Sequence, residues 1–226
     1  MSGIISDNLG RGSGLIKAAA GGVWAKISNT TVTGGAVSTV SIDGFVDAAT
    51  YKCYRFIGKM KPDTNHVFPQ IRMNISASAD TGDNYFTNCP YSWNYANATG
   101  HMPYFNQYGG YSAYPGALDS PEKDRWSFGH NYNASDEWVK QSSSEFGYMD
   151  LVFFDGGASN DSHIVGHLTI DHRSAHSSVD STRGTAVCMI NGTWTENSNQ
   201  GSGLTFFFSS GDIANDTNIT LYGVKL

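Results

Sequence analysis

The sequence predicts an all-β fold, a jelly-roll-like β-sandwich of two sheets, and three observations favour it. The chain of 226 residues contains 26 glycines and only 15% charged residues, a composition typical of many short strands joined by tight turns. No long run has the period of an amphipathic helix between recognisable caps. Stretches of strand-forming residues recur between turn clusters without an internal repeat, which favours a sandwich over a propeller or a β-helix.

The N-terminal half contains four predicted strands. Three are rich in β-branched and aromatic residues and are bounded by Gly, Asn or Asp: Val23–Ile27, Thr39–Ile42 and Tyr51–Gly58. The fourth, Val67–Ala77, alternates apolar and polar residues, which predicts one buried face and one exposed face. The next segment, Asp80–Asn84, is predicted to be a turn, because it has neither the length nor the closing Glu of a calcium-binding loop.

The C-terminal half contains the remaining strands. Phe146–Phe154 is apolar on both faces, which predicts a central strand. His163–Ile170 and Gly184–Trp194 follow as further strands. The chain closes with Leu204–Leu226, in which two segments with one apolar face flank a loop of Ser, Gly, Asp and Asn. This pattern predicts a β-hairpin with one face turned toward the core.

A segment of different composition, residues 85–132, interrupts the strands as an aromatic-rich insertion. It holds 13 of the chain's 29 aromatic residues, mixed with Asn, Gly, Ser, Pro and Ala and without alternation. A loop of this length in a compact domain is usually functional or part of an interface. A mixture of Tyr with Asn, Gly and Ser is typical of recognition surfaces. Two interpretations remain open: contact with a host-surface glycan, or packing onto the sandwich or between subunits. The candidates for glycan contact are Trp93, Tyr95, Tyr104, Tyr108, Tyr111, Tyr114 and Trp126.

Residues 1–21 are predicted to form an extended N-terminal arm, and residues 22–226 a single sandwich domain. Glycines at positions 10, 12 and 14 make the backbone of the arm costly to order, yet the arm is too apolar for a solvated tail. Such a segment is expected to order against a partner, and the alternative is a frayed terminus. The residues expected to dock are Ile4, Ile5, Asn8, Leu9, Arg11, Leu15, Ile16 and Lys17.

Three short motifs carry a resemblance to a known family. They are Ser209–Asn215 followed by Leu221–Val224, the run Asp7–Lys17 in the arm, and Gly58–Asp63 after a predicted strand. These motifs resemble those of tail-fibre and accessory virion proteins of marine tailed bacteriophages. The resemblance extends to the layout of residues 22–226, although the aromatic-rich insertion is longer than expected for that family.

The resemblance implies a virion structural protein without enzymatic activity, assembled in the host cytoplasm and exposed on the surface of the particle, on its tail or capsid. It implies a tail-fibre or adhesin component that docks onto other virion proteins through its arm, contacts the host surface and forms a homotrimer. The alternative within this class is a capsid decoration or cement protein that bridges coat subunits.

Charge and hydropathy argue against several other partners. A net charge of −6 without clustered Lys or Arg argues against binding nucleic acid. No stretch approaches the roughly 20 apolar residues of a spanning helix and the N-terminus lacks a secretory pattern, so we expect a soluble protein without membrane insertion. His163 and His167 would stand about 13 Å apart on a strand, too far to share one ion. The three cysteines lack a Cys-x-x-Cys pair, and no metal site is predicted.

No catalytic constellation is recognisable in the sequence. The Gly-x-Ser-x-Gly elbow of serine hydrolases is absent. A polysaccharide-degrading enzyme would need two carboxylates at a fixed separation in a groove. Glu145, Asp150, Asp155 and Asp161 are the candidates, but scattered carboxylates are ordinary on a protein surface. We therefore predict no enzymatic activity, catalytic residue or cofactor, and polysaccharide degradation is the less favoured alternative.

Overall fold

The computed structural model describes residues 24–47, 49–65, 67–88, 91–93, 102–104, 107–108, 124–128, 131–132, 136–137, 143–157, 160–173, 183–196 and 199–225. The predicted arm and all its proposed docking residues lie outside these ranges. Every regular element in the described ranges is a β-strand, which confirms the all-β prediction. Within the same ranges, no helix could cross a membrane.

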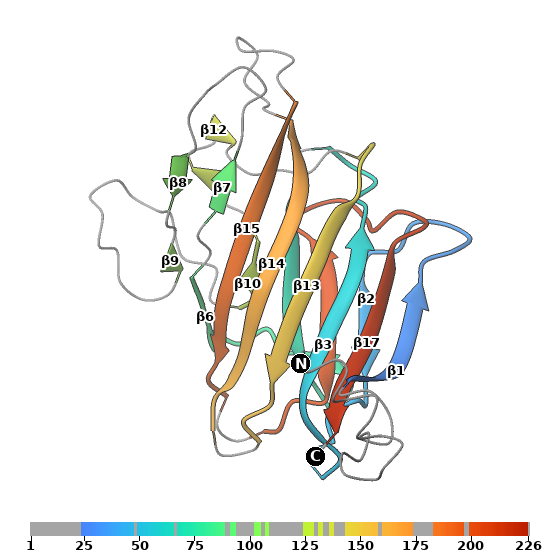
Figure 1. Ribbon diagram of the computed structural model, residues 1–226, viewed down its shortest axis with the longest axis vertical. Helices are drawn as coiled ribbons and strands as arrows, with labels where there is room; N and C mark the ends of the chain where they lie inside the picture. The colour runs from blue at the N-terminus through green and yellow to red at the C-terminus, as the bar shows by residue number, and fades with distance from the viewer. Residues whose placement is uncertain are drawn as a thin grey trace, which may run out of the picture.

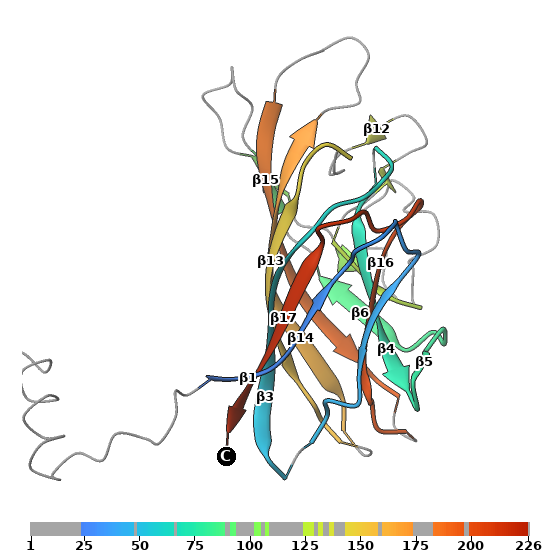
Figure 2. The ribbon, with the colours of Figure 1, turned by 90° about the vertical axis from the view of Figure 1, so that its right-hand side faces the viewer.

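Two sheets form the layers of the sandwich (Figures 1 and 2). In the large sheet, β1 (Trp24–Thr31), β17 (Asn218–Lys225), β3 (Tyr51–Met60) and β13 (Gly147–Phe154) are neighbours in that order. In the small sheet, the order is β2 (Val40–Asp43), β16 (Gly203–Phe208), β4 (Pro69–Ile75) and β10 (Trp126–Ser127). The chain passes repeatedly from one sheet to the other, and all pairings among these strands are antiparallel. This arrangement is a jelly roll, as predicted.

Further strands widen the large sheet beyond β13. The hairpin of β14 (Ser162–Arg173) and β15 (Arg183–Trp194) comes first. The insertion then adds β6 (Tyr85–Asn88) and β7 (Tyr91–Trp93) to β15, β8 (Met102–Tyr104) to β7, and β9 (Gln107–Tyr108) to β6. Two short pieces complete the fold: β5 (Ser78–Ala79) beside β4, and the pair β11 (Asn131–Tyr132) and β12 (Asp136–Glu137). The insertion was expected to be one long loop, but part of it extends the sheet.

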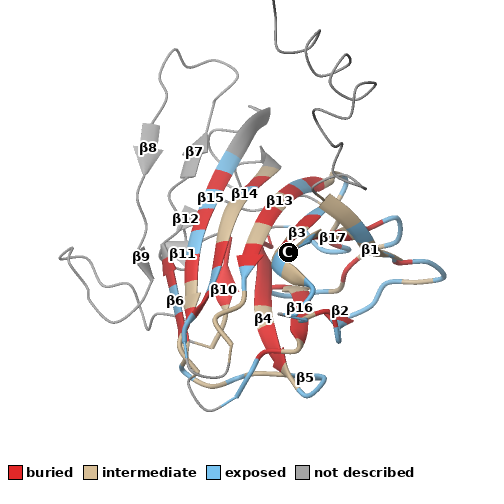
Figure 3. Cartoon of the chain, turned by 60° about the horizontal axis from the view of Figure 1, so that its bottom comes forward, coloured by how far each residue is buried: buried red, intermediate tan, exposed pale blue. Residues whose placement is uncertain are grey.

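The buried residues lie between the two sheets (Figure 3). This core is rich in aromatic residues. Phe45, from the loop after β2, lies edge-on to Tyr54 and Phe56 of β3, with ring centroids 4.9 and 5.4 Å apart. Phe56 in turn meets Phe206 of β16 across the sandwich at 5.6 Å. Edge-to-face contacts of this kind contribute about 0.5–1.5 kcal/mol each beyond the burial of apolar area. The core therefore holds the two sheets in a fixed relation.

The predicted closing hairpin is wrong. β16 lies between β4 and β2 in the small sheet, whereas β17 lies between β1 and β3 in the large sheet. Residues 209–217 carry the chain from one sheet to the other. The predicted buried faces are confirmed, because Leu204 and Phe206 approach the core from one side, and Ile219 and Leu221 approach it from the other. Alternation identifies the buried face of a strand but not the sheet to which the strand belongs.

The strands predicted at Phe146–Phe154 and Val67–Ala77 both form, but their faces differ from the prediction. β13 is central in the large sheet, as expected; its outward residues Tyr148 and Phe154, however, are 59% and 42% exposed. β4 buries not only Ile71 and Met73 but also the polar Gln70 and Asn74. Hydrogen bonds make this burial tolerable, since Gln70 donates to Ser127 and Asn74 accepts from Thr205.

Candidate functional site

The two ends of the aromatic-rich insertion meet at one edge of the sandwich. Tyr85 in β6 opens the insertion and Trp126 in β10 lies near its end; their rings are edge-to-face with centroids 5.4 Å apart. Tyr85 is 1% exposed and Trp126 is fully buried. We call this contact and the polar groups around it the base of the insertion. The base joins the large sheet, through β6, to the small sheet, through β10.

Trp126 is a core residue, so its predicted role in glycan contact is wrong. Its indole Nε1 donates a hydrogen bond to the carbonyl oxygen of Thr193 at 3.2 Å. The ring lies directly against Gly192 of β15, where an added Cβ would come within 2.7 Å of Trp126 Cδ1 and Nε1. The absence of a side chain at Gly192 therefore makes the space that the indole fills. A ring that is enclosed in this way cannot stack on a sugar.

The other predicted contact residues fall into two groups. Trp93 lies in β7 opposite Ala186 of β15 and Met102 of β8, Tyr104 lies in β8 opposite Tyr91, and Tyr108 lies in β9 opposite Thr87. These three positions are therefore on the short strands that extend the large sheet. Tyr95, Tyr111 and Tyr114 lie outside the described residues.

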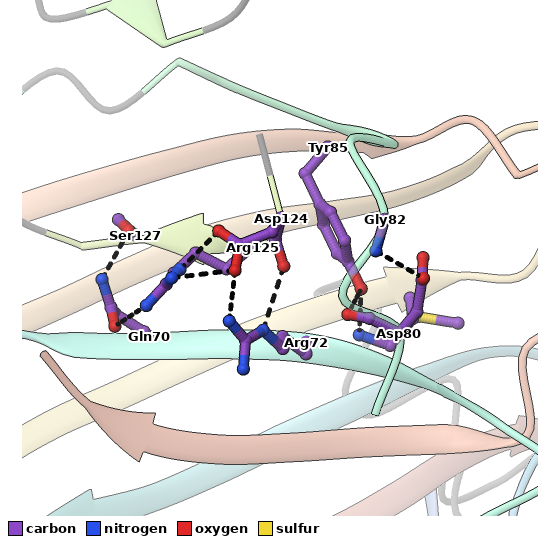
Figure 4. Close-up of polar contacts among 9 residues, drawn as sticks. Gln70, Arg72, Asp80, Gly82, Tyr85, Asp124, Arg125 and Ser127 are labelled. Carbon is purple, nitrogen blue, oxygen red and sulfur yellow. Dashed lines mark hydrogen bonds and ion pairs between the residues drawn. The ribbon is translucent and has the colours of Figure 1, made fainter. Parts of the chain in front are cut away.

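An ion cluster fastens the end of the insertion to the small sheet (Figure 4). Asp124 accepts hydrogen bonds from Arg125 Nε at 2.7 Å and Nη2 at 2.8 Å, and it also forms an ion pair with Arg72 of β4. Arg72 Nε reaches the Asp124 carbonyl oxygen at 3.0 Å as well. Arg125 Nη1 donates to Gln70 at 3.0 Å, and Gln70 donates to Ser127 at 3.1 Å. The contacts of Arg72 and Gln70 join β4 to the segment 124–127, whereas the Asp124–Arg125 hydrogen bonds lie within that segment.

The environment of the ion cluster stabilises the charged forms of its arginine and aspartate side chains. The guanidinium groups of Arg72 and Arg125 lie over the ring of Phe207 in β16, at 4.8 and 5.6 Å from its centroid. Burial raises the pKa of Asp124, but the hydrogen bonds from Arg125 and Arg72 outweigh burial and hold the pKa below its ordinary value. Asp124 is therefore a carboxylate at neutral pH and bridges both arginines.

A second polar group secures the beginning of the insertion. The Tyr85 hydroxyl donates to the Asp80 carbonyl oxygen at 3.1 Å and accepts from the Met73 amide at 2.9 Å. The Asp80 carboxylate accepts from Gly82 N at 2.8 Å and from Trp194 Nε1 at 2.7 Å. The turn predicted at Asp80–Asn84 is thus present, and the Asp80 carboxylate forms hydrogen bonds that stabilise it and connect it to Trp194.

The candidate catalytic and metal-binding side chains do not converge in the described part of the chain. Asp150 receives two hydrogen bonds from Arg55, at 2.7 and 2.5 Å, and Asp155 accepts one from Gln200 at 3.1 Å. His163 and His167 lie in one strand, as predicted, and both are exposed. No group of three potential metal ligands occurs among the described residues. The contacts in these ranges support the insertion.

Two of the motifs that carry the family resemblance contact each other. Asp63 Oδ1 accepts hydrogen bonds from the Asp212 amide at 2.7 Å and the Thr64 hydroxyl at 2.8 Å. The Asp63 amide donates back to Asp212 O at 2.9 Å, and Ala214 N donates to Lys61 O at 2.7 Å. We call this set of contacts between residues 61–64 and 209–214 the clasp. It joins the end of β3 to the crossing between β16 and β17.

Comparison with protein families, with curated proteins and with solved structures found no match to this chain. The family resemblance therefore depends on the three short motifs and on the layout of the strands.

The residues of the base were not predicted as a site, although the sequence contains a signal for them. The insertion has few charged residues, and most of them fall in the run Glu122–Arg125, immediately before Trp126. A charged run beside a large aromatic residue at the end of a long insertion is a plausible anchor. Its partners Arg72 and Phe207 lie far away in sequence, so pattern alone could not identify them.

Proposed function

We propose that the chain is a structural protein of a bacteriophage virion, exposed on the particle surface as a tail-fibre or adhesin component. Its N-terminal arm docks onto other virion proteins, its insertion contacts the host surface, and the chain forms a homotrimer. The observation that supports this proposal is the resemblance carried by the three short motifs, two of which contact each other in the clasp.

The base of the insertion supports the adhesin role. A recognition loop is most effective when a rigid scaffold positions it, because less conformational freedom is then lost on binding. Here Tyr85, Trp126 and the Asp124 cluster provide that scaffold at the edge of the sandwich. Each aromatic contact with a glycan is weak, and many copies on one particle supply avidity.

Deletion of residues 1–20 tests the docking role. The truncated protein should fold and remain soluble but be missing from purified particles, because the sandwich keeps its core while the arm is lost. Replacing residues 1–20 by a Gly/Ser sequence of equal length is the matched control for chain length, and it should also fail to incorporate. Normal incorporation of either variant would refute docking through the arm.

Alanine substitution of Trp93, Tyr104 and Tyr111 tests host contact. The triple variant should enter particles normally but adsorb to host cells at least about tenfold more slowly, because three aromatic contacts are lost from every copy and avidity multiplies the effect. Unchanged adsorption by correctly assembled particles would exclude the insertion as the contact surface.

A capsid decoration protein remains the alternative within the structural class. It would place the sandwich between coat subunits, where its faces would bridge neighbours instead of projecting from the particle. Labelling the chain with an antibody and imaging particles by electron microscopy distinguishes the two: label on the tail supports the adhesin, and label over the capsid shell supports decoration.

A further inference from the structure

We infer that the outer face of the large sheet is a self-association surface that is covered by another copy of this chain. The outer face consists of the outward-pointing positions of β3, β13, β14, β15 and β6. This inference deepens the homo-oligomer in the proposed function and rests on it for biological meaning. Its test uses the isolated protein, so its outcome is independent of incorporation into a virion.

The apolar side chains that are exposed in the described ranges are concentrated on this face. Among the described residues, seven large hydrophobic residues are exposed, and six of them, all except Val37, belong to the outer face. Their exposed fractions are 59% for Tyr148, 57% for Met189, 46% for Phe86, 42% for Phe154, 38% for Ile57 and 36% for Val187. Contiguous apolar surface of this kind marks an interaction site more often than scattered residues do.

The strand register places these residues on one face. Val152 of β13 and Val165 of β14, which lie opposite each other, are also on this face, and polar residues separate some of the exposed apolar ones. Phe154 of β13 pairs with His163, which pairs with Thr193, which pairs with Phe86 of β6. Residues that are directly opposite on adjacent antiparallel strands share a face, so the two phenylalanines close one end of the surface. Tyr148 and Val187 are both opposite Thr169 and mark the other end.

The outer face of the small sheet provides an internal comparison. There the outward positions of β2, β16 and β4 include the polar residues Ser41, Thr205, Asn74 and Arg72 and the aromatic residue Phe207, and Thr205 and Asn74 are buried. The outward positions of β13 are Tyr148, Asp150, Val152 and Phe154, of which Tyr148 and Phe154 are exposed. Among the described residues, exposed apolar side chains are therefore more frequent on the large sheet.

The only carboxylate among the outward positions of β13 is paired, whereas Lys59 of β3, opposite Tyr148, lies over the ring of Phe146. Asp150 forms a bidentate ion pair with Arg55 at 2.7 and 2.5 Å, and Arg55 also lies 5.6 Å from the ring centroid of Trp24. Such a pair tolerates burial better than a lone charge, because each partner satisfies the other. The apolar strands β13 and β15 thus offer no unpaired carboxylate for a strongly basic partner to recognise.

The dimensions of the face fit another copy of the same surface. Five strands at about 4.8 Å spacing and eight residues at about 3.4 Å rise span about 24 by 27 Å, or about 650 Å² in projection. A stable interface buries roughly 800 Å² of accessible surface per partner, which a side-chain-covered face of this size supplies. Two sheets pack face to face about 10 Å apart, and another copy of the chain presents a sheet of the same size.

Light scattering after size-exclusion chromatography tests this inference. The wild-type chain should elute with two or three times the 24.4 kDa mass of one copy. Met189→Glu and Tyr148→Lys should each raise the dissociation constant at least about tenfold, because they place an uncompensated charge in the interface, and Lys at position 148 would lie opposite Lys59. Both positions are more than half exposed in a single chain, so the variants should keep their circular dichroism spectrum and fold.

Val37→Glu is the matched control, since Val37 is 38% exposed and lies away from the outer face. It should leave the oligomer intact. Three results would overturn the inference: a wild-type mass of 24.4 kDa at every concentration, unchanged association in both outer-face variants, or equal dissociation in the control.

Discussion

At the scale of single residues, the indole of Trp126 determines how the insertion is attached. The ring fills the space left by the missing side chain of Gly192, donates to Thr193 O and meets Tyr85 edge-to-face. Sequence reasoning placed Trp126 among recognition aromatics because its neighbours are Tyr, Asn and Ser. Composition does not distinguish an aromatic residue that holds a loop from one that the loop presents, and here burial makes that distinction.

Trp126→Ala should lower the free energy of unfolding by about 3–5 kcal/mol, because it removes a fully buried indole and leaves a cavity between the sheets. Urea denaturation followed by circular dichroism measures the loss. Val37→Ala, at an exposed position, should change stability by less than about 0.5–1 kcal/mol. A Trp126 variant as stable as the wild type would show that the ring is not part of the core.

The paired aspartates predict how stability depends on pH. Hydrogen bonds from Arg55 hold the pKa of Asp150 below its ordinary value, and the Asp124 pKa is lowered as well. Their contributions are therefore fully present above the unfolded pKa of about 3.9 and are lost as pH falls through the lower folded values. Stability should be nearly constant from about pH 7 to 5 and should fall below about pH 4.

Asp124→Asn should reduce this acid-dependent loss, because the substituted side chain no longer titrates, while lowering stability at pH 7. Asp161→Asn is the control, since Asp161 is exposed. Urea midpoints measured from pH 7 to 3 give both quantities. Identical pH profiles for Asp124→Asn and the wild type would contradict the role assigned to the carboxylate.

At the scale of elements, the strands were predictable and several of their partners were not. Each predicted strand overlaps an observed one, since alternation and β-branched content depend only on local sequence. The closing hairpin failed because β16 and β17 bury their apolar faces in the same core from opposite sheets. The site was predicted only in outline. The position of the insertion was recognisable, but its base depends on Arg72 and Phe207, which only the folded chain brings to Asp124 and Arg125.

The clasp gives a sharp test at this scale. Gly211 has φ of +69°, and an added Cβ would lie 2.4 Å from Thr64 Oγ1 and 2.7 Å from Asp63 Oδ1. Gly34 has φ of +80° with nothing within 4 Å of an added Cβ. Gly34→Ala should therefore cost only the backbone strain of about 1–2 kcal/mol, and Gly211→Ala should cost more, because it also displaces Asp63. Equal thermal unfolding curves for the two variants would mean that the clasp contributes nothing.

At the scale of the whole molecule, the two sheets have different outer surfaces. The outer side of the small sheet anchors the insertion through the Asp124 cluster and Phe207, whereas the large sheet exposes aromatic and aliphatic side chains along β13, β15 and β6. In the proposed oligomer, this side of the large sheet faces neighbouring copies.

The most direct test of the virion role is electron cryo-microscopy of purified particles that contain the full chain. The account predicts density for the sandwich on the particle surface, with the large sheet turned toward neighbouring copies and the insertion pointing away from the particle. Particles that lack this density, while the chain is present in the infected cell, would contradict it.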